Sequence, residues 1–452
     1  MSEFQMVEEF QRFLEALNAR DPEFVRREIY FMGKNCADEG LLGHVPLYPL
    51  FLNELITAKY HRFGALVWLA LDRIMDVITD PEHPANVPMR SFLTIPPEVE
   101  QVLRSRPRGG MLPRVVRPDT VLHGNRIIAH EFNVSWPGGI SDSDLTTDVL
   151  AENTLFKMFA AEMAAQGVDI PRQPPYKSTT LLLEQLVEAA ELDNPYIAVV
   201  IPTPDVSPFG PEEIQLSRRI FDFFIHEGFD ADFIHPHQVE YDHWPHYQGR
   251  RIDVMYRIFE WGHVMGTHRD EYGPILQAYM DGKLPVVNAF HSEAVSAKSI
   301  FELLHCRELH WCFDDMPLEE LLETIPYTVN VRQADSPEQF LEEKERWVFK
   351  KIKGSASDAV LLGVSAGDDV WREVLQFGLE TGGVVAQEYV DTPIMLMAMN
   401  PGEDLVQVPR YLDVNPFYFA GKMGNFFSRF SEMMMTSYVS WGGGILPVVP
   451  MG

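Results

Sequence analysis

The sequence has few cysteines, a deficit of basic residues and no long hydrophobic run. Its three cysteines, Cys36, Cys306 and Cys312, stand at none of the spacings typical of a zinc site and are too few for a disulfide framework, which fits a reducing compartment. The longest apolar stretch, residues 65–71, is far shorter than the roughly 20 residues that cross a bilayer. The first residues are acidic where a signal peptide needs a basic start. We therefore expect a cytoplasmic protein that does not enter the membrane.

The deficit of positive charge is large, because 37 Lys and Arg stand against 66 Asp and Glu, for a formal net charge of −29. A field of this sign repels nucleic acid and anionic lipid, so we expect neither as a partner. It does not exclude a nucleotide, since local basic residues and Mg²⁺ can outweigh it. An acidic surface also keeps proteins in solution, which is the simpler interpretation. With 46% apolar and 23% charged residues, the chain has the composition of a compact globular protein.

Hydrophobic spacing divides the chain into three patterns. Apolar residues at helical spacing predict helices through the first hundred residues or so. Strand and helix patterns then alternate, with strands at 196–201, 253–259 and 284–289 and helices from 211, near 272–281 and at 293–305, which favours an α/β domain with a largely parallel sheet. The third pattern predicts strands at 347–352, 360–363 and 384–390, a turn at 354–358 and a helix at 370–381.

One short segment carries a set of residues suited to metal and phosphate. Arg117 and Asp119 precede a predicted turn at Gly124, and Glu131 and Asn133 follow it. Positions i and i+2 of a strand share a face, so Glu131 and Asn133 would project together, and a hairpin would bring Asp119 beside them. Two carboxylates and an amide oxygen suit Mg²⁺, and Arg117 suits a phosphoryl group. Taken alone, these residues are more typical of a surface turn.

The order R-x-D, spacer, E-x-N resembles the metal and phosphate motif of glutathionylspermidine synthetases, which are circularly permuted ATP-grasp enzymes. Later segments resemble the same family: LPVVNAFHSEAVSAKSIFELL, which contains Lys298; WVFKKIKGSASDAVLLG, which contains Lys350; and VVAQEYVDTP. A lysine inside a strand is unusual, because a buried ammonium needs an anionic partner; a lysine on an edge strand is the alternative. Lys351 stands where the family usually has proline, which leaves Lys350, Lys351 and Lys353 as candidates.

The resemblance implies an α/β, ATP-grasp-like, circularly permuted fold that uses ATP and Mg²⁺ and has no amidase domain. It implies Mg²⁺ at Asp119, Glu131 and Asn133 and a transferred phosphoryl group at Arg117. The nucleotide would be held by Lys298, Lys350, the flap residues Gly354 and Ser355, and the hinge residues Gln387, Glu388, Tyr389 and Val390. The corresponding segments are a helical cap (1–105), a metal- and phosphate-binding part (106–190), an α/β substrate lobe (191–310) and a nucleotide-binding part (311–452).

Residues for the remaining substrates are suggested by position. Ser135 and Ser141 follow the metal motif, where a carboxylate substrate would lie, although an ordinary glycine-rich turn explains them equally well. Arg257 resembles a family arginine near the acceptor. Arg410 and Arg429 would face phosphates or, as isolated arginines more often do, form surface ion pairs.

The implied activity is that of an ATP-dependent carboxylate–amine ligase, which forms an amide through an acyl phosphate on small peptide, amino-acid or polyamine-type substrates. A small-molecule kinase with the same ATP site is the alternative, and a nucleotide-binding scaffold is a third reading that the full set of polar residues disfavours. A homodimer is compatible with this reading. The segment HPHQVEYDHWPH, with His235, His237, Asp242, His243 and His246, could bind Zn²⁺, but its irregular spacing and two prolines favour a polar loop.

Overall fold

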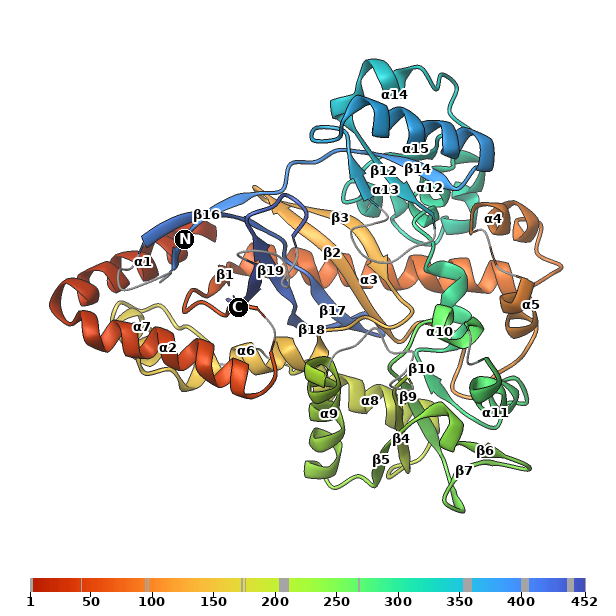
Figure 1. The fold of residues 1–452 in the computed structure, drawn as a ribbon, viewed down its shortest axis with the longest axis horizontal. Helices are drawn as coiled ribbons and strands as arrows, with labels where there is room; N and C mark the ends of the chain where they lie inside the picture. Colours follow the sequence, from red (N-terminus) through yellow and green to blue (C-terminus); the bar gives the residue numbers. More distant parts are fainter. Residues whose placement is uncertain are drawn as a thin grey trace.

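The computed structural model describes most of the chain. The residues that it describes are 3–41, 43–93, 95, 97–171, 174, 176–202, 211–266, 269–352, 360–399, 406–436 and 443–451. The fold is mixed α/β, with helices packed around several separate sheets (Figure 1).

The N-terminal residues form the predicted helices. Asp21 caps α2 by accepting from Phe24 N at 3.0 Å, and Asn53 caps α3 by accepting from Ile56 N at 2.9 Å. Helix α3 crosses the molecule behind β2 and β3 (Figure 1). Gly64 permits this packing, because a Cβ there would lie 2.1 Å from the Tyr418 ring. The helices are α1 (Glu3–Arg20), α2 (Pro22–Asp38), α3 (Glu54–Thr79), α4 (Asn86–Leu93) and α5 (Pro97–Leu103).

The centre of the molecule is an antiparallel sheet with strand order β18-β17-β2-β3. It joins segments almost 300 residues apart: β2 (Val115–His123), β3 (Arg126–Asn133), β17 (Pro416–Phe419) and β18 (Lys422–Phe426). Beside it lies the antiparallel sheet β15 (Ile394–Met399), β16 (Val406–Leu412), β19 (Ser428–Ser431) and β20 (Gly444–Leu446). A parallel pair, β1 (Leu50–Leu52) and β21 (Val448–Pro450), ties the N-terminal region to the end of the chain.

The predicted parallel sheet is confirmed, with order β10-β9-β4-β5 and only parallel pairs. Two predictions here were too long: the strand at 284–289 forms a ladder only at β10, and the helix at 293–305 is divided into the 3-10 helix η2 and the short α12. The elements of this region are α8 (Ser178–Ala190), β4 (Ile197–Val200), α9 (Pro211–His226), β5 (Ala231–Ile234), β9 (Val254–Arg257), α10 (Trp261–Met265), α11 (Arg269–Met280), β10 (Val286–Val287), η2 (Phe290–Val295) and α12 (Ile300–His305).

The third predicted pattern is also confirmed, as an antiparallel sheet of order β11-β14-β12-β13 covered by α15. This sheet has an apolar core of its own, in which Phe349 stacks on Trp371 with ring centroids 3.8 Å apart. The predicted turn at 354–358 lies outside the described residues. The elements are β11 (Thr328–Asn330), α14 (Gln339–Glu342), β12 (Trp347–Lys351), β13 (Val360–Leu362), α15 (Asp368–Thr381) and β14 (Val384–Glu388).

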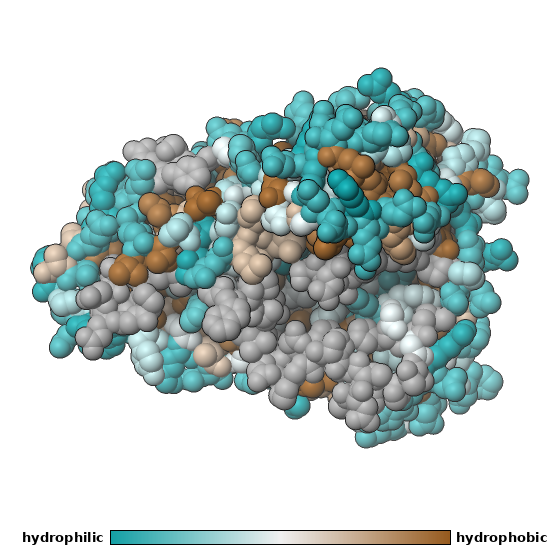
Figure 2. Space-filling model, turned by 45° about the horizontal axis from the view of Figure 1, so that its top comes forward, coloured by the Kyte–Doolittle hydropathy of each residue, from teal (hydrophilic) through white to brown (hydrophobic). Residues whose placement is uncertain are grey.

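Most of the remaining core is continuous, and it joins the N-terminal helices to α6 and α7, to the central sheet and to one face of the parallel sheet. Where Figure 2 is coloured, hydrophilic residues lie mainly toward the edges of the face, and apolar residues form small groups among them. Among the described residues, no helix combines the length and the apolar character needed to span a bilayer. The other elements are α6 (Ile140–Glu152), α7 (Thr154–Ala165), η1 (Pro236–Gln238), β6 (Glu240–Tyr241), β7 (Pro245–Tyr247), β8 (Arg250–Arg251), η3 (Arg307–Phe313), α13 (Leu318–Leu322) and η4 (Lys344–Arg346).

Candidate functional site

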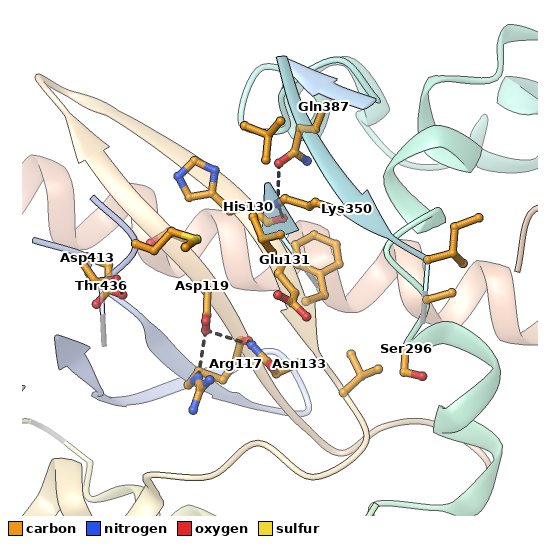
Figure 3. A pocket seen from close by; sticks show the side chains of 18 of the residues that line it. Arg117, Asp119, His130, Glu131, Asn133, Ser296, Lys350, Gln387, Asp413 and Thr436 are labelled. Atoms are coloured by element: carbon orange, nitrogen blue, oxygen red, sulfur yellow. Dashed lines mark hydrogen bonds and ion pairs between the residues drawn. The ribbon is translucent and has the colours of Figure 1, made fainter. Parts of the chain in front are cut away.

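A cavity of about 900 Å³ lies between the β2–β3 hairpin and the sheet that contains β12 and β14. This volume is within the range typical of ligand sites. Figure 3 shows side chains from both walls directed into it, with Asp119, Glu131 and Asn133 on the hairpin and Lys350 and Gln387 on the facing strands. Sequence segments near 117–136, 260–297, 348–392 and 413–436 thus meet in one place.

The hairpin has the predicted form. Gly124 occupies the turn with a φ of 59°, a left-handed conformation that glycine adopts without strain. Asp119 is paired directly with Glu131, and Arg117 with Asn133. The register shifts between Asp119 and Thr120. The three proposed metal ligands therefore lie on adjacent strands at the cavity wall, whereas their role as ligands stays a prediction.

Asp119 is the centre of a network of charged and polar groups. Its Oδ1 accepts from Arg117 Nε at 3.0 Å and from Asn133 Nδ2 at 2.9 Å, and its Oδ2 accepts from Arg429 Nη2 at 2.8 Å. Burial alone would raise the pKa of Asp119, but the two guanidinium groups outweigh burial and lower the pKa to about 2. Asp119 is therefore anionic at neutral pH, as a metal ligand must be.

The donor set of the hairpin fits Mg²⁺, because two carboxylates and an amide are the hard oxygen donors that this ion takes. Glu131 Oε1 accepts from Lys298 Nζ at 2.7 Å, and this contact holds the Glu131 carboxylate in place. Three of the carboxylates that line the cavity pair with basic residues outside its lining: Glu131 with Lys298, Glu293 with Arg257 and Glu388 with Arg346. Among the described residues, the charged side chains of the lining are Asp119, Glu131, Glu260, Glu293, Glu388 and Asp413, with Arg117, Lys350 and Arg429.

Lys350 projects into the cavity from β12, whereas Lys351 is exposed on the opposite face of the strand. Lys350 Nζ donates to His130 O at 2.7 Å and to Gln387 Oε1 at 2.6 Å. Burial, with a contribution from Lys298, lowers the pKa of Lys350 to about 8, although Glu131 acts in the opposite direction. Of the two candidate lysines that the structure describes, Lys350 lines the cavity and Lys351 does not. Lys353, Gly354 and Ser355 lie outside the described residues.

The predicted hinge, Gln387 to Val390, lines the same wall. Gln387 has a further role that the sequence did not indicate: its side chain accepts from Lys350 and donates from Nε2 to Thr328 Oγ1 at 3.2 Å, which fixes the direction of the lysine. Glu388 accepts from Arg346 Nη2 at 2.8 Å. The side chains that surround this end are mostly apolar and suit a planar base: Val348, Ile352, Val360, Leu362, Met434 and Met435.

Of the suggested substrate residues, Ser135 alone lines the cavity, where its Oγ donates to Glu293. Arg257 is fully buried behind the wall, and its guanidinium donates to Glu293 Oε1 at 2.7 Å and to protein oxygens that include Asn288 O and Ser135 O. It therefore braces the wall and does not face the cavity. Ser141 is buried in α6 and, like Arg257, is not among the lining residues, so the substrate contact of these two residues stays a prediction.

Two lining residues had no motif to indicate them. Asp413 is buried, and its Oδ2 accepts from Arg429 Nη2 at 2.6 Å and from Thr436 Oγ1. Arg429 was expected at phosphates or in a surface ion pair. It lines the cavity, where it joins Asp413 to Asp119, so it does not form a surface ion pair, and its contact with phosphates stays a prediction. Arg410 pairs with Glu432 at 2.8 Å and is not among the lining residues.

The histidine-rich segment lies apart from this cavity. It forms η1 and the small sheet β6-β7-β8, where the rings of His235 and His237 stack with centroids 5.8 Å apart. His246 lies 3.9 Å from Asp242. In the part of the chain that the structure describes, no three His, Cys, Asp or Glu side chains come together as a metal site. The polar loop of the prediction is thus a short β-sheet.

Comparisons with known proteins show a likeness of fold. No protein-family model matches the sequence, and no curated protein matches it either. The structure is similar to that of a glutathione synthetase-like effector from Globodera pallida in its apo form, with a TM-score of 0.61, 10% identity and coverage of 95% of this chain and 97% of that chain. A protein assigned as a γ-glutamylcysteine synthetase from Methylobacillus flagellatus has a TM-score of 0.41 at 11% identity and covers 82% of this chain and 84% of its own. The chain therefore has the fold of a glutathione synthetase-like protein over nearly its whole length.

Proposed function

We propose that this chain is an ATP-dependent carboxylate–amine ligase of the circularly permuted ATP-grasp type, in which residues 1–105 form a helical cap. It would join a small peptide, amino-acid or polyamine-type substrate through an amide bond and release ADP and phosphate. The observation that carries the proposal is the cavity itself, in which the R-x-D and E-x-N side chains face Lys350 and the hinge across a single space. The fold that the chain shares with a glutathione synthetase-like effector supports it.

The residues of the two walls would bind different parts of the nucleotide and its metal ion. Gln387 to Val390 and the apolar side chains around them would hold the base, and Lys350 and Lys298 would hold the phosphates. Asp119, Glu131 and Asn133 would hold Mg²⁺, which neutralises phosphate charge when bound. Arg117 would hold the γ-phosphoryl group. Its guanidinium is fixed by Asp119, by Gly138 O at 2.5 Å and by the Phe427 ring, whose centroid is 5.2 Å from its central carbon.

The chemistry needs no protein nucleophile. An oxygen of the substrate carboxylate attacks the γ-phosphorus of ATP, and ADP leaves. The amine then attacks the acyl carbon, phosphate leaves and the nitrogen loses a proton. The chain accelerates both steps by positioning the reactants and by offsetting charge. Ser135 and Glu293 line the wall beside the hairpin, where the acyl group would lie.

The test is calorimetric titration with a non-hydrolysable ATP analogue, with and without Mg²⁺, followed by assays of ADP release with carboxylates and amines supplied singly and in pairs. We expect magnesium-dependent binding of the analogue and ADP release only when both substrates are present. A stable phosphorylated product formed without an amine would instead identify a kinase. Failure to bind the analogue at millimolar concentration would refute the proposal.

A further inference from the structure

Both carboxylates of the proposed metal site are already paired with cations of the chain. Asp119 contacts Arg117 and Arg429, and Glu131 contacts Lys298. The pairs are shielded from solvent, because the side chains of Asp119, Arg429 and Lys298 are 18%, 17% and 5% exposed. Salt and water screen such pairs far less than surface pairs. A divalent cation that arrives alone therefore has to compete with these basic groups.

Arg429 would compete with a metal ion for two carboxylates at once. Its Nη2 atom lies 2.8 Å from Asp119 Oδ2 and 2.6 Å from Asp413 Oδ2, so one nitrogen stands between two carboxylate oxygens. A divalent cation typically takes such a position. The three residues come from β2, from the segment between β16 and β17, and from β19, so the contact depends on the folded chain. Asp413 is also held by Arg429 N at 2.7 Å, which fixes its carboxylate.

Lys298 is tied to the opposite wall through its backbone, because Lys298 N donates to Ile352 O at 3.2 Å, just beyond β12. Its side chain is not among those that line the cavity, and its Nζ donates to Glu131 Oε1 at 2.7 Å. Lys350, from the same wall, reaches across to His130 O. Lys298 therefore approaches the metal carboxylate from the side on which the phosphates would lie.

We infer that Arg429 and Lys298 are place-holding cations, which occupy the metal carboxylates until a nucleotide draws them to its phosphates, so that metal and nucleotide enter together. The inference rests on the proposed function for the identity of the polyanion. Phosphate oxygens accept the same guanidinium and ammonium donors as carboxylates do. The metal alone would leave two displaced cations nearby, and the nucleotide alone would face uncovered carboxylates. Each ligand therefore raises the affinity for the other by the same factor.

The experiment is a titration of Mn²⁺, detected by electron paramagnetic resonance, into the nucleotide-free protein. We expect Arg429→Met to bind Mn²⁺ at least tenfold more tightly than the wild type, or about 1.4 kcal/mol. Arg429→Lys is the matched control, which keeps the charge and the weak wild-type binding. Asp413→Asn added to Arg429→Met should remove most of the gain. Equal Mn²⁺ affinity of the wild type and Arg429→Met would overturn the inference.

A second comparison covers the case in which Arg429→Met does not fold. Lys298→Met uncovers Glu131, whose side chain is 30% exposed and tolerates the loss of its partner better, and the same tenfold gain is expected. In the wild type, the non-hydrolysable ATP analogue should raise Mn²⁺ affinity at least tenfold. An unchanged Mn²⁺ affinity with the analogue bound would overturn the inference that Arg429 and Lys298 leave the carboxylates for the phosphates. If the analogue does not bind, the proposed function fails, and the nucleotide-free comparison of wild type and variants still decides whether the chain's own cations hold the carboxylates.

Discussion

Replacing Lys350 by methionine would separate the function of this lysine from its effect on stability. The side chain is 6% exposed, and its ammonium is met by two neutral acceptors, His130 O and Gln387 Oε1. Burial lowers its pKa to about 8 from 10.5. Methionine has a similar length and no charge, so it fills the same space without the desolvation penalty of an ammonium.

The expected magnitude follows from the pKa of Lys350. A decrease from 10.5 to about 8 corresponds to a penalty on the order of 3 kcal/mol for the charged form in the folded state. Because the folded pKa is the lower one, the unfolded chain binds more protons between these values, and stability rises with pH across them. Against this gain, the variant loses two hydrogen bonds of about 1 kcal/mol each. At pH 7, Lys350→Met should be as stable as the wild type, or more stable by ~1 kcal/mol.

Urea unfolding followed by tryptophan fluorescence at pH 7 and pH 10 measures this difference. The wild type should gain stability from Lys350 between the two pH values, and the variant should lack that gain. Affinity for the ATP analogue should fall about a hundredfold, since loss of one partner of a buried charge contact costs 2–5 kcal/mol or more. Lys351→Met, on the exposed face of the same strand, is the matched control and should bind normally. A variant that loses several kcal/mol of stability but keeps its affinity would refute the reasoning.

Three further substitutions test other parts of the argument. Glu131→Gln keeps the shape of the side chain and removes a metal charge, so ADP release should be abolished with an unchanged circular dichroism spectrum; full activity would contradict the metal assignment. Arg257→Met leaves the buried Glu293 carboxylate without its basic partner and should reduce the free energy of unfolding by about 3–5 kcal/mol in urea, whereas a loss below 1 kcal/mol would show that the residue does not brace the wall. Gly64→Ala places a Cβ 2.1 Å from the Tyr418 ring and should lower stability by about 1–3 kcal/mol, while Gly33→Ala, with no atom nearer than 4.0 Å, should not; equal melting temperatures would contradict the close packing of α3.

Elements with strong local signals were predictable from the sequence. The β2–β3 hairpin, the strands β12 and β14 and the helix α15 all have clear patterns, and all are present. The region around β10 and α12 was predicted less well. There the chain follows tertiary contacts: Asn288 uses its side chain to bond Val115 and Val134, and Lys298 N bonds Ile352 O. Such contacts end a strand and interrupt a helix without any mark in the local sequence.

The candidate site, too, was predictable from the sequence only in part. Its hairpin half is contained in a single short segment, so the spacing of Asp119 and Glu131 was enough to place them together. Asp413 and Arg429 reach the cavity only because β16, β17 and β19 bring them there, and neither carries a motif. Gln387 was predicted to hold the nucleotide, but its contact with Lys350 depends on the register of β12 against β14, in which Val348 pairs with Gln387. That register follows from long-range pairing.

The two walls of the cavity belong to different hydrophobic cores. The hairpin packs into the large core, and the sheet with β12 and β14 packs over its own smaller core. The contact that Lys350 makes across the cavity is polar, because its ammonium donates to His130 O. A ligand that takes over Lys350 would replace this contact without repacking either core, since close-packed interiors resist deformation. Lys350, which would bind the ligand, is thus also a group that joins the walls in its absence.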